Sequence, residues 1–94
     1  MAESHFPFST GDNVFVRTVS YFFTGKIVGI RGDFIGIHHA AWIADTGRFG
    51  EFMAKGPGDQ CEIEALEPER VVWIHKACMT DITGWPHELP SKTK

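Results

Sequence analysis

Residues 21–43, YFFTGKIVGIRGDFIGIHHAAWI, decide the fold that this sequence predicts. Two runs of β-branched and aromatic side chains lie on either side of Gly32 and Asp33, and a two-residue linker of this kind between apolar runs indicates a β-hairpin. Gly25 and Gly29 fall inside the first run, where glycine marks a bulge or bend that lets a short strand curve. We therefore expect two paired strands, the first of them bent at its glycines.

The strand pattern extends to both sides of this hairpin. The side chains of residues 13–19 alternate between two faces, as they do along a strand. Residues 70–74 form an apolar run that favours a buried strand. The sequence therefore predicts four or five short strands, drawn from residues 13–19, 21–31, 34–43, 61–66, 70–74 and 77–83.

One helix is expected after the third strand. Phe49 and Phe52 fall on one helical face at i, i+3 spacing, and Asp45 or Thr46 can accept hydrogen bonds from the first free backbone N–H groups. Gly56 stands where a left-handed residue would end the helix. The helix is therefore expected to run from just after these capping residues to the glycine.

Short, glycine-bent strands at close spacing favour a small barrel over a sandwich. A chain of 94 residues forms one domain, with no room for a second core. We expect an extended lead-in at residues 1–12 and an irregular tail at residues 84–94. The expected anchors or interface residues of these two segments are Phe6, Phe8, Trp85 and His87.

Two stretches resemble the paired motifs of Sm-like proteins. The first runs from Val14 to His39, and the second is IHKACM at residues 74–79. The resemblance implies a small, closed or nearly closed SH3-like or Sm-like β-barrel. Together with the helix expected from the residue pattern, the predicted fold is mainly β, a small barrel with one short helix inserted after the third strand, where the family usually has a short loop. The resemblance also implies rings formed by strand pairing between subunits, and RNA binding near the pore. The matching residues are Asp33, Phe34, His75 and Lys76.

A second resemblance covers nearly the whole chain. The runs at 17–19, 24–28, 40–49 and 85–90 are similar to those of small uncharacterised proteins of phages and prophages. This resemblance implies a viral context and carries no chemistry of its own.

Composition narrows the classes of function. The formal net charge of −3 argues against binding of duplex nucleic acid, which favours a basic face. Cys61 and Cys78 have no metal-ligand spacing and are expected to be buried free thiols. No apolar run is long enough to span a membrane, and no secretion leader is evident. We therefore expect no membrane partner, and a protein located in the cytoplasm of the host cell or in a virion.

Catalysis and metal binding are not predicted. The sequence contains none of the nucleophile, phosphate-loop or zinc-protease motifs that would indicate an enzyme, so we expect a non-enzymatic protein without cofactor or metal. His38 and His39 are adjacent in a predicted strand. Their rings are therefore expected to point to opposite faces and cannot chelate one metal together.

The most suggestive cluster lies around the predicted start of the helix. An exposed Trp42 could stack on a planar ring and Arg48 could pair with a phosphate. His75 and Lys76 would add positive charge. The alternative is structural, with Trp42 in the core and Arg48 solvated. The candidate ligand-binding residues are Trp42, Asp45, Thr46, Arg48, His75 and Lys76.

The leading hypothesis is a phage-type homo-oligomer that binds and sequesters a small anionic, nucleotide-like signal of host defence. The first alternative is a structural accessory of a virion, such as a capsid, connector or tail component. A third is an Sm-like RNA-binding protein.

Overall fold

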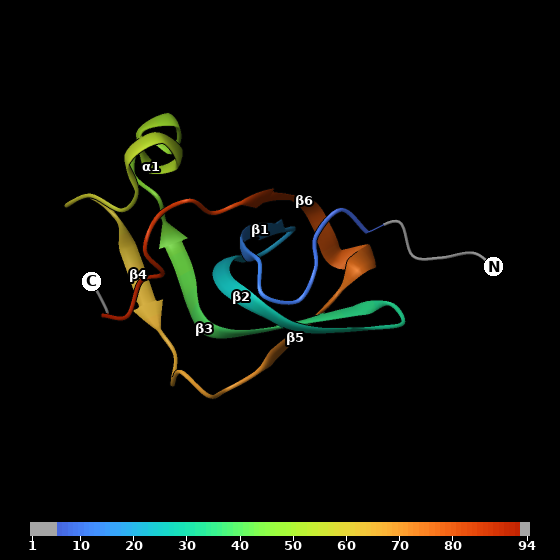
Figure 1. Ribbon diagram of the computed structural model, residues 1–94. Helices are drawn as coiled ribbons and strands as arrows, with labels where there is room; N and C mark the ends of the chain where they lie inside the picture. The colour runs from blue at the N-terminus through green and yellow to red at the C-terminus, as the bar shows by residue number, and fades with distance from the viewer. Residues whose placement is uncertain (1–5, 93–94) are drawn as a thin grey trace.

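The computed structural model describes residues 6–92, and its longest feature is the hairpin of β2 (Phe22–Arg31) and β3 (Phe34–Asp45) (Figure 1). The turn consists of the two predicted residues, because Arg31 pairs with Phe34. Gly32 has a φ of +55°, a backbone conformation that glycine adopts without steric cost. The hairpin prediction is therefore confirmed.

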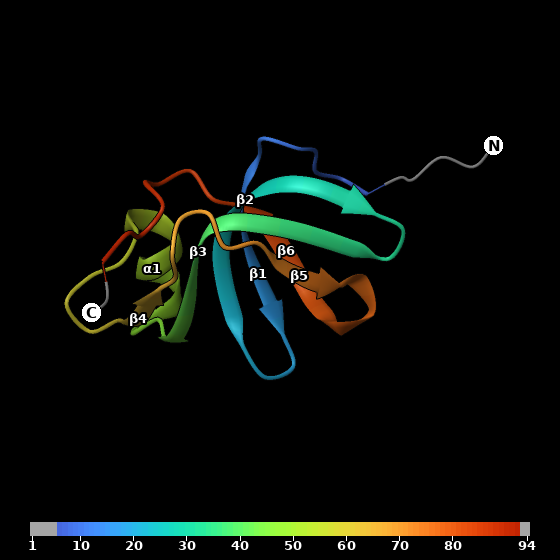
Figure 2. The same cartoon turned by 90° about the horizontal axis from the view of Figure 1, so that it is seen from below.

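Strand β2 bends at both predicted glycines. Its pairing with β3 shifts register between Thr24 and Lys26 and again between Ile27 and Gly29. At the first shift the backbones approach closely, since a Cβ atom added to Gly25 would lie 2.9 Å from the Cβ of Ile37. Figure 2 shows β2 turning sharply between its pairing with β1 and its far end. At Gly25, therefore, the bend requires glycine because a side chain would collide with Ile37.

The remaining strands pair on both sides of this hairpin. Strand β1 (Asn13–Thr18) pairs with β2 and with β6 (Met79–Gly84). Strands β4 (Glu62–Ala65) and β5 (Val72–His75) pair with successive halves of β3. The sheet is therefore antiparallel and six-stranded, in the order β4-β3-β2-β1-β6 with β5 beside β3.

The mainly β class with one helix is confirmed, but the strand pairing does not close the barrel. Among residues 6–92, no pairing joins β6 to β4 or β5, so the sheet keeps open edges. Strand β5 is four residues long and leads through a 3₁₀ turn at Lys76–Cys78 into β6. The expected strand at 77–83 therefore begins only at Met79.

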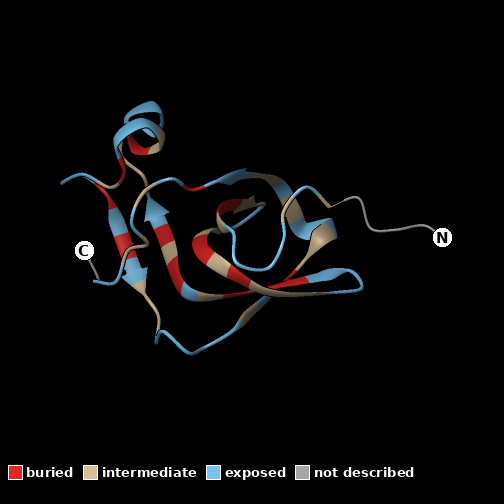
Figure 3. Ribbon diagram, viewed as in Figure 1, coloured by how far each residue is buried: buried red, intermediate tan, exposed pale blue. Residues whose placement is uncertain are grey.

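Two apolar clusters form the core, and β1 lies between them. Val14, Phe15 and Val16 are consecutive and all buried, because side chains from both faces of β1 are covered. Figure 3 shows the buried residues concentrated on the central strands. The first cluster contains Val14, Val16, Ile27, Ile35, Ile37, Ala40 and Ile74. The second contains Phe15, Ala41, Ile43, Phe52, Cys61, Ile63 and Trp85.

The helix α1 (Phe49–Lys55) starts later than predicted. Its N-cap is Arg48, which makes no side-chain capping hydrogen bond. The prediction that Asp45 or Thr46 caps the helix is wrong, because pairing of Asp45 with Glu62 extends β3 to this point. The predicted end is confirmed, since the N–H of Gly56 donates to the carbonyl oxygen of Phe52.

Two burial predictions are also wrong. Residues 70–74 are not a buried strand, because β5 has one face covered by the core and the other directed to solvent. Ile74 is buried, whereas Trp73 is 44% exposed. Both cysteines are free as expected, but only Cys61 is buried and Cys78 is exposed.

The bend in β2 gives the first testable prediction. Gly25→Ala places a methyl group against Ile37 inside the core, and we expect it to lower the free energy of unfolding by about 1–3 kcal/mol. Gly29→Ala is the matched control in the same strand, because its nearest neighbour is an atom of Trp73 at 3.8 Å. Urea denaturation measures both. Equal losses of stability in the two variants would contradict the account of the bend.

Candidate functional site

His39 is the structural irregularity around which the candidate site forms. It has a φ of +49°, and it is the one non-glycine residue between positions 6 and 92 with a positive φ. A side chain in this left-handed conformation costs about 1–2 kcal/mol. The register shift of β3 against β2 lies at the same place.

This backbone conformation overturns the prediction that the two histidine rings point to opposite faces. The rings of His38 and His39 lie edge to face, with centroids 4.5 Å apart. Strand alternation fails here because the left-handed residue reverses the direction of its own side chain. Groups of three or more potential metal ligands do not occur in the described part of the chain, so the pair does not form a metal site by itself.

Lys26 completes a basic cluster with these histidines. In the strand register, Lys26 lies opposite His38 on β3 and opposite Asn13 on β1. The side chains of Asn13, Lys26 and His38 therefore lie in one row across three strands. Burial, followed by the positive charges of His39 and Lys26, lowers the pKa of His38. The cluster therefore holds several groups that repel one another when charged.

Carboxylates do not neutralise this cluster. The two ion pairs found among residues 6–92 lie elsewhere, at Arg17–Asp81 and Arg70–Glu67. Hydrogen bonds from Arg17 lower the pKa of Asp81, and those from Arg70 lower the pKa of Glu67 to about 2. These carboxylates are therefore committed to their own partners.

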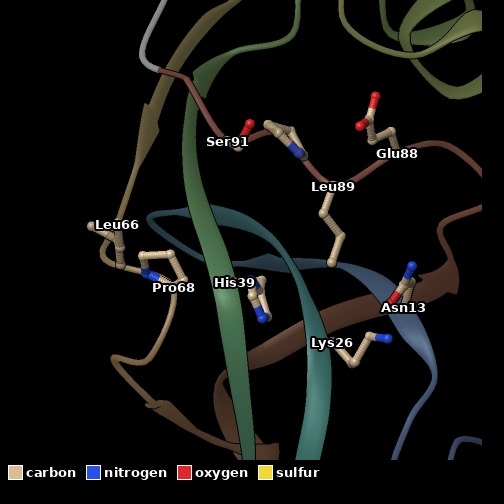
Figure 4. Close-up of a pocket in the computed structure, with 9 residues that line it drawn as sticks. Asn13, Lys26, His39, Leu66, Pro68, Glu88, Leu89 and Ser91 are labelled. Atoms are coloured by element: carbon tan, nitrogen blue, oxygen red, sulfur yellow. The ribbon is translucent and has the colours of Figure 1, made fainter.

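Two members of this cluster, Lys26 and His39, line a cavity of about 390 Å³, here called the His39 pocket. This volume lies within the range of small-ligand sites, roughly 300–1,000 Å³. Figure 4 shows Leu89 directed toward Lys26 and His39, while the carboxylate of Glu88 turns away from them. The pocket is lined by Asn13, Lys26, His39, Leu66, Pro68, Glu88, Leu89, Pro90 and Ser91.

One buried acceptor in this pocket has no partner. The Oδ1 atom of Asn13 is buried and makes no hydrogen bond. A buried polar atom of this kind costs roughly 1–3 kcal/mol unless a partner satisfies it.

The C-terminal tail forms one wall of the pocket, and two side chains hold it. Trp85 is 3% exposed, its backbone N–H donates to the carbonyl oxygen of Asn13 at 2.8 Å, and its indole N–H donates to that of Glu88 at 3.2 Å. The ring of His87 lies 2.8 Å, through Nε2, from the carbonyl oxygen of Met53 on α1. Both residues therefore attach the tail to its own chain.

The residues predicted around the helix start are only partly brought together. Thr46 and Arg48 line a separate hollow of about 270 Å³ beside α1, and Trp42 does not line it. The ring of Trp42 is half-buried and lies edge to face against Tyr21, at 5.4 Å. Asp45 accepts a hydrogen bond from the N–H of Gly47 at 2.8 Å. Helix α1, with seven residues, is too short to supply a strong anion site.

The residues matched to the Sm motifs do lie together, away from the pocket. The ring of His75 packs edge to face against Phe34, with centroids 4.9 Å apart. The N–H of Lys76 donates to the carbonyl oxygen of Asp33 at 2.7 Å, and its Nζ lies 5.0 Å from the ring centroid of Phe6. Phe6 and Phe8 are half-buried and pack against the first core cluster.

An exposed aromatic surface beside this group was missed, and the sequence contained a signal for it. The indole of Trp73 lies against Gly36, where an added Cβ atom would come within 2.7 Å of the ring. Gly36 pairs with Gly29, and the two glycines are equidistant from the hairpin turn. We call the outward side chains of Phe34, Val71 and Trp73, which are 43%, 38% and 44% exposed, the Trp73 face.

Comparison with models of protein families, with curated proteins and with solved structures found no match for this chain. Among residues 6–92, no helix is long and apolar enough to cross a membrane.

The strained backbone of His39 gives the second prediction. His39→Gly removes the left-handed strain and we expect it to raise the free energy of unfolding by about 1 kcal/mol. His38→Gly is the matched control, because glycine in regular strand backbone lowers stability by about 0.5–1 kcal/mol. Thermal and urea unfolding of both variants provide the comparison. Destabilisation of similar size in the two variants would show that the backbone at position 39 is not strained.

Proposed function

We propose that this protein is a non-enzymatic binding protein that holds a small, nucleotide-like anion in the His39 pocket. The observation that carries the proposal is a basic cluster that forms no ion pair with a carboxylate among residues 6–92: Lys26 and His39 line a ligand-sized cavity, and His38 lies beside them. Stability alone does not favour a strained histidine beside two other basic groups. Strain and unpaired charge of this kind concentrate at functional sites.

Three features of the pocket match three parts of such a ligand. Lys26 and His39 can pair with a phosphate. The apolar side of the pocket, formed by Leu66, Pro68 and Leu89, offers a surface against which a planar ring can pack. Asn13 also lines the pocket, and its side-chain amide can exchange hydrogen bonds with a base or a ribose hydroxyl.

The finer fold type and the biological context belong to the same proposal. The sheet order, with β1 between β2 and β6 and with a 3₁₀ turn before β6, supports an incomplete SH3-like or Sm-like barrel. Open sheet edges support a homo-oligomer, because unpaired strands readily pair between copies. The resemblance to phage proteins supports a host-defence nucleotide as the ligand, which the protein would sequester.

Isothermal titration against linear and cyclic nucleotides tests the binding proposal. We expect at least one of them to bind, and Lys26→Gln to weaken that binding roughly tenfold or more, because it removes a charge-assisted contact with the phosphate. Lys55→Gln is the matched control, since Lys55 lines the hollow beside α1 and not the His39 pocket. Its affinity should stay within about twofold of the parent chain.

Two results would contradict this proposal. The first is the absence of binding heat with every nucleotide in a folded sample. The second is a reversed pattern, in which Lys55→Gln weakens binding and Lys26→Gln does not. That result would place the ligand beside α1, where Arg48 lies.

The Trp73 face favours one second candidate, a structural accessory of a virion. Exposed aromatic side chains on a sheet face are typical of surfaces that contact another protein. Mass spectrometry of purified particles separates the two functions. A virion component would be present in stoichiometric amounts, whereas a sequestering protein would be absent from the particle.

A further inference from the structure

We infer that the His39 pocket selects a terminal phosphate monoester, a dianion, over a cyclic phosphodiester, a monoanion, and that binding takes up a proton from solution. This inference rests on the proposed function and specifies the chemical class of its ligand. It also assigns a specificity-determining role to His39.

Three groups that can carry positive charge lie close together at this pocket. Lys26 carries one permanent positive charge, and the two imidazoles beside it can each accept one more. A monoanion is matched by the lysine alone. The second negative charge of a dianion is balanced only when an imidazole also carries a positive charge. The cluster can therefore supply more positive charge than a diester needs.

These basic groups repel one another when no ligand is bound. The lowered pKa of His38 has burial as its main cause and the charges of His39 and Lys26 as the next two. A dianion in the pocket lies beside Lys26 and His39, and its negative charge offsets the positive charges that lower the pKa of His38. Histidine normally changes charge between about pH 5 and 8, so protonation accompanies binding near neutral pH.

The other charged groups near His39 come from β2, β3, the C-terminal tail and the segment after β4. Strand β2 contributes Lys26 and strand β3 contributes His38, both cationic when charged. The tail contributes Glu88, whose carboxylate points away from the imidazole (Figure 4). The segment after β4 carries Glu67, which is paired with Arg70. In the described structure, therefore, neither of these carboxylates pairs with the ring of His39 when the ring is charged. The phosphate of a ligand can take that place.

The direction of the pH dependence follows from this arrangement. Above about pH 6.5 a phosphate monoester is already mainly a dianion, so raising the pH further removes only the proton on the protein. The affinity for the monoester should therefore fall as the pH rises from about 6.5 to 8.5. The affinity for a diester should change little over the same range.

Calorimetry with the full chain tests the inference. The probes are adenosine 5′-monophosphate and adenosine 3′,5′-cyclic monophosphate, titrated near pH 7 in two phosphate-free buffers that differ in ionisation enthalpy. We expect the monoester to bind roughly tenfold more tightly than the diester. We also expect a net uptake of about half a proton to one proton per monoester bound.

His39→Asn provides the decisive variant. Asparagine tolerates left-handed backbone and carries no charge, so the pocket keeps its shape and loses one titrating group. The preference for the monoester and the proton uptake should both shrink to less than half of their parent values. Lys55→Gln is again the matched control, because it removes a basic group that does not line the pocket, and it should leave both measurements unchanged.

The outcomes separate this inference from the proposed function. Equal affinity for the two nucleotides without proton uptake would overturn the inference and leave the proposed function standing. A parent-like preference and proton uptake in His39→Asn would overturn the role of His39. If neither nucleotide binds the folded chain, both the inference and an adenine-nucleotide ligand fail.

Discussion

The contact between the backbone of Gly25 and the side chain of Ile37 is the constraint on which the rest of the structure depends. It allows β2 to bend, and the bend lets one hairpin contribute side chains to both core clusters. The same register shift requires an extra residue on β3, and that residue is the left-handed His39. The bend that forms the core therefore also turns the imidazole toward Lys26.

This coupling explains why an energetically unfavourable arrangement persists. Backbone strain at His39 and repulsion among three basic groups both oppose folding, and the core on either side of β1 offsets them. Binding sites often keep such strain because it holds a side chain ready for its ligand. The pocket would therefore change little in shape when a ligand enters.

The sequence predicts the elements that depend on local chemistry. Gly25 and Gly29 mark the bends of β2, and Gly32 marks the hairpin turn, because glycine in a strand pattern or between two apolar runs is a local signal that can be identified from single residues. The end of α1 is predictable at Gly56 for the same reason. The start of α1 could not be predicted in this way, because pairing with β4 keeps Asp45 in a strand. Strand pairing between distant segments here overrides a local capping signal.

The candidate site depends on non-local geometry and was predicted less well. The His39 pocket is formed by β1, β2, β3, the segment after β4 and the tail, and no spacing within one segment indicates that they meet. The left-handed conformation of a histidine has no sequence signal. By contrast, Thr46 and Arg48 both line the hollow beside α1 because they are close together in the sequence.

The pairing of β1 with β6, and the hydrogen bond from Trp85 to Asn13, join the two ends of the described chain. Strand β1 therefore lacks one neighbour until about seventy later residues have been made, and synthesis of this length takes several seconds. During that interval the nascent chain would expose the apolar faces of β1 and β2 on the ribosome. Because Ile82 of β6 packs against the first core cluster and Trp85 belongs to the second, both clusters can be completed only after the last part of the described chain has been synthesised.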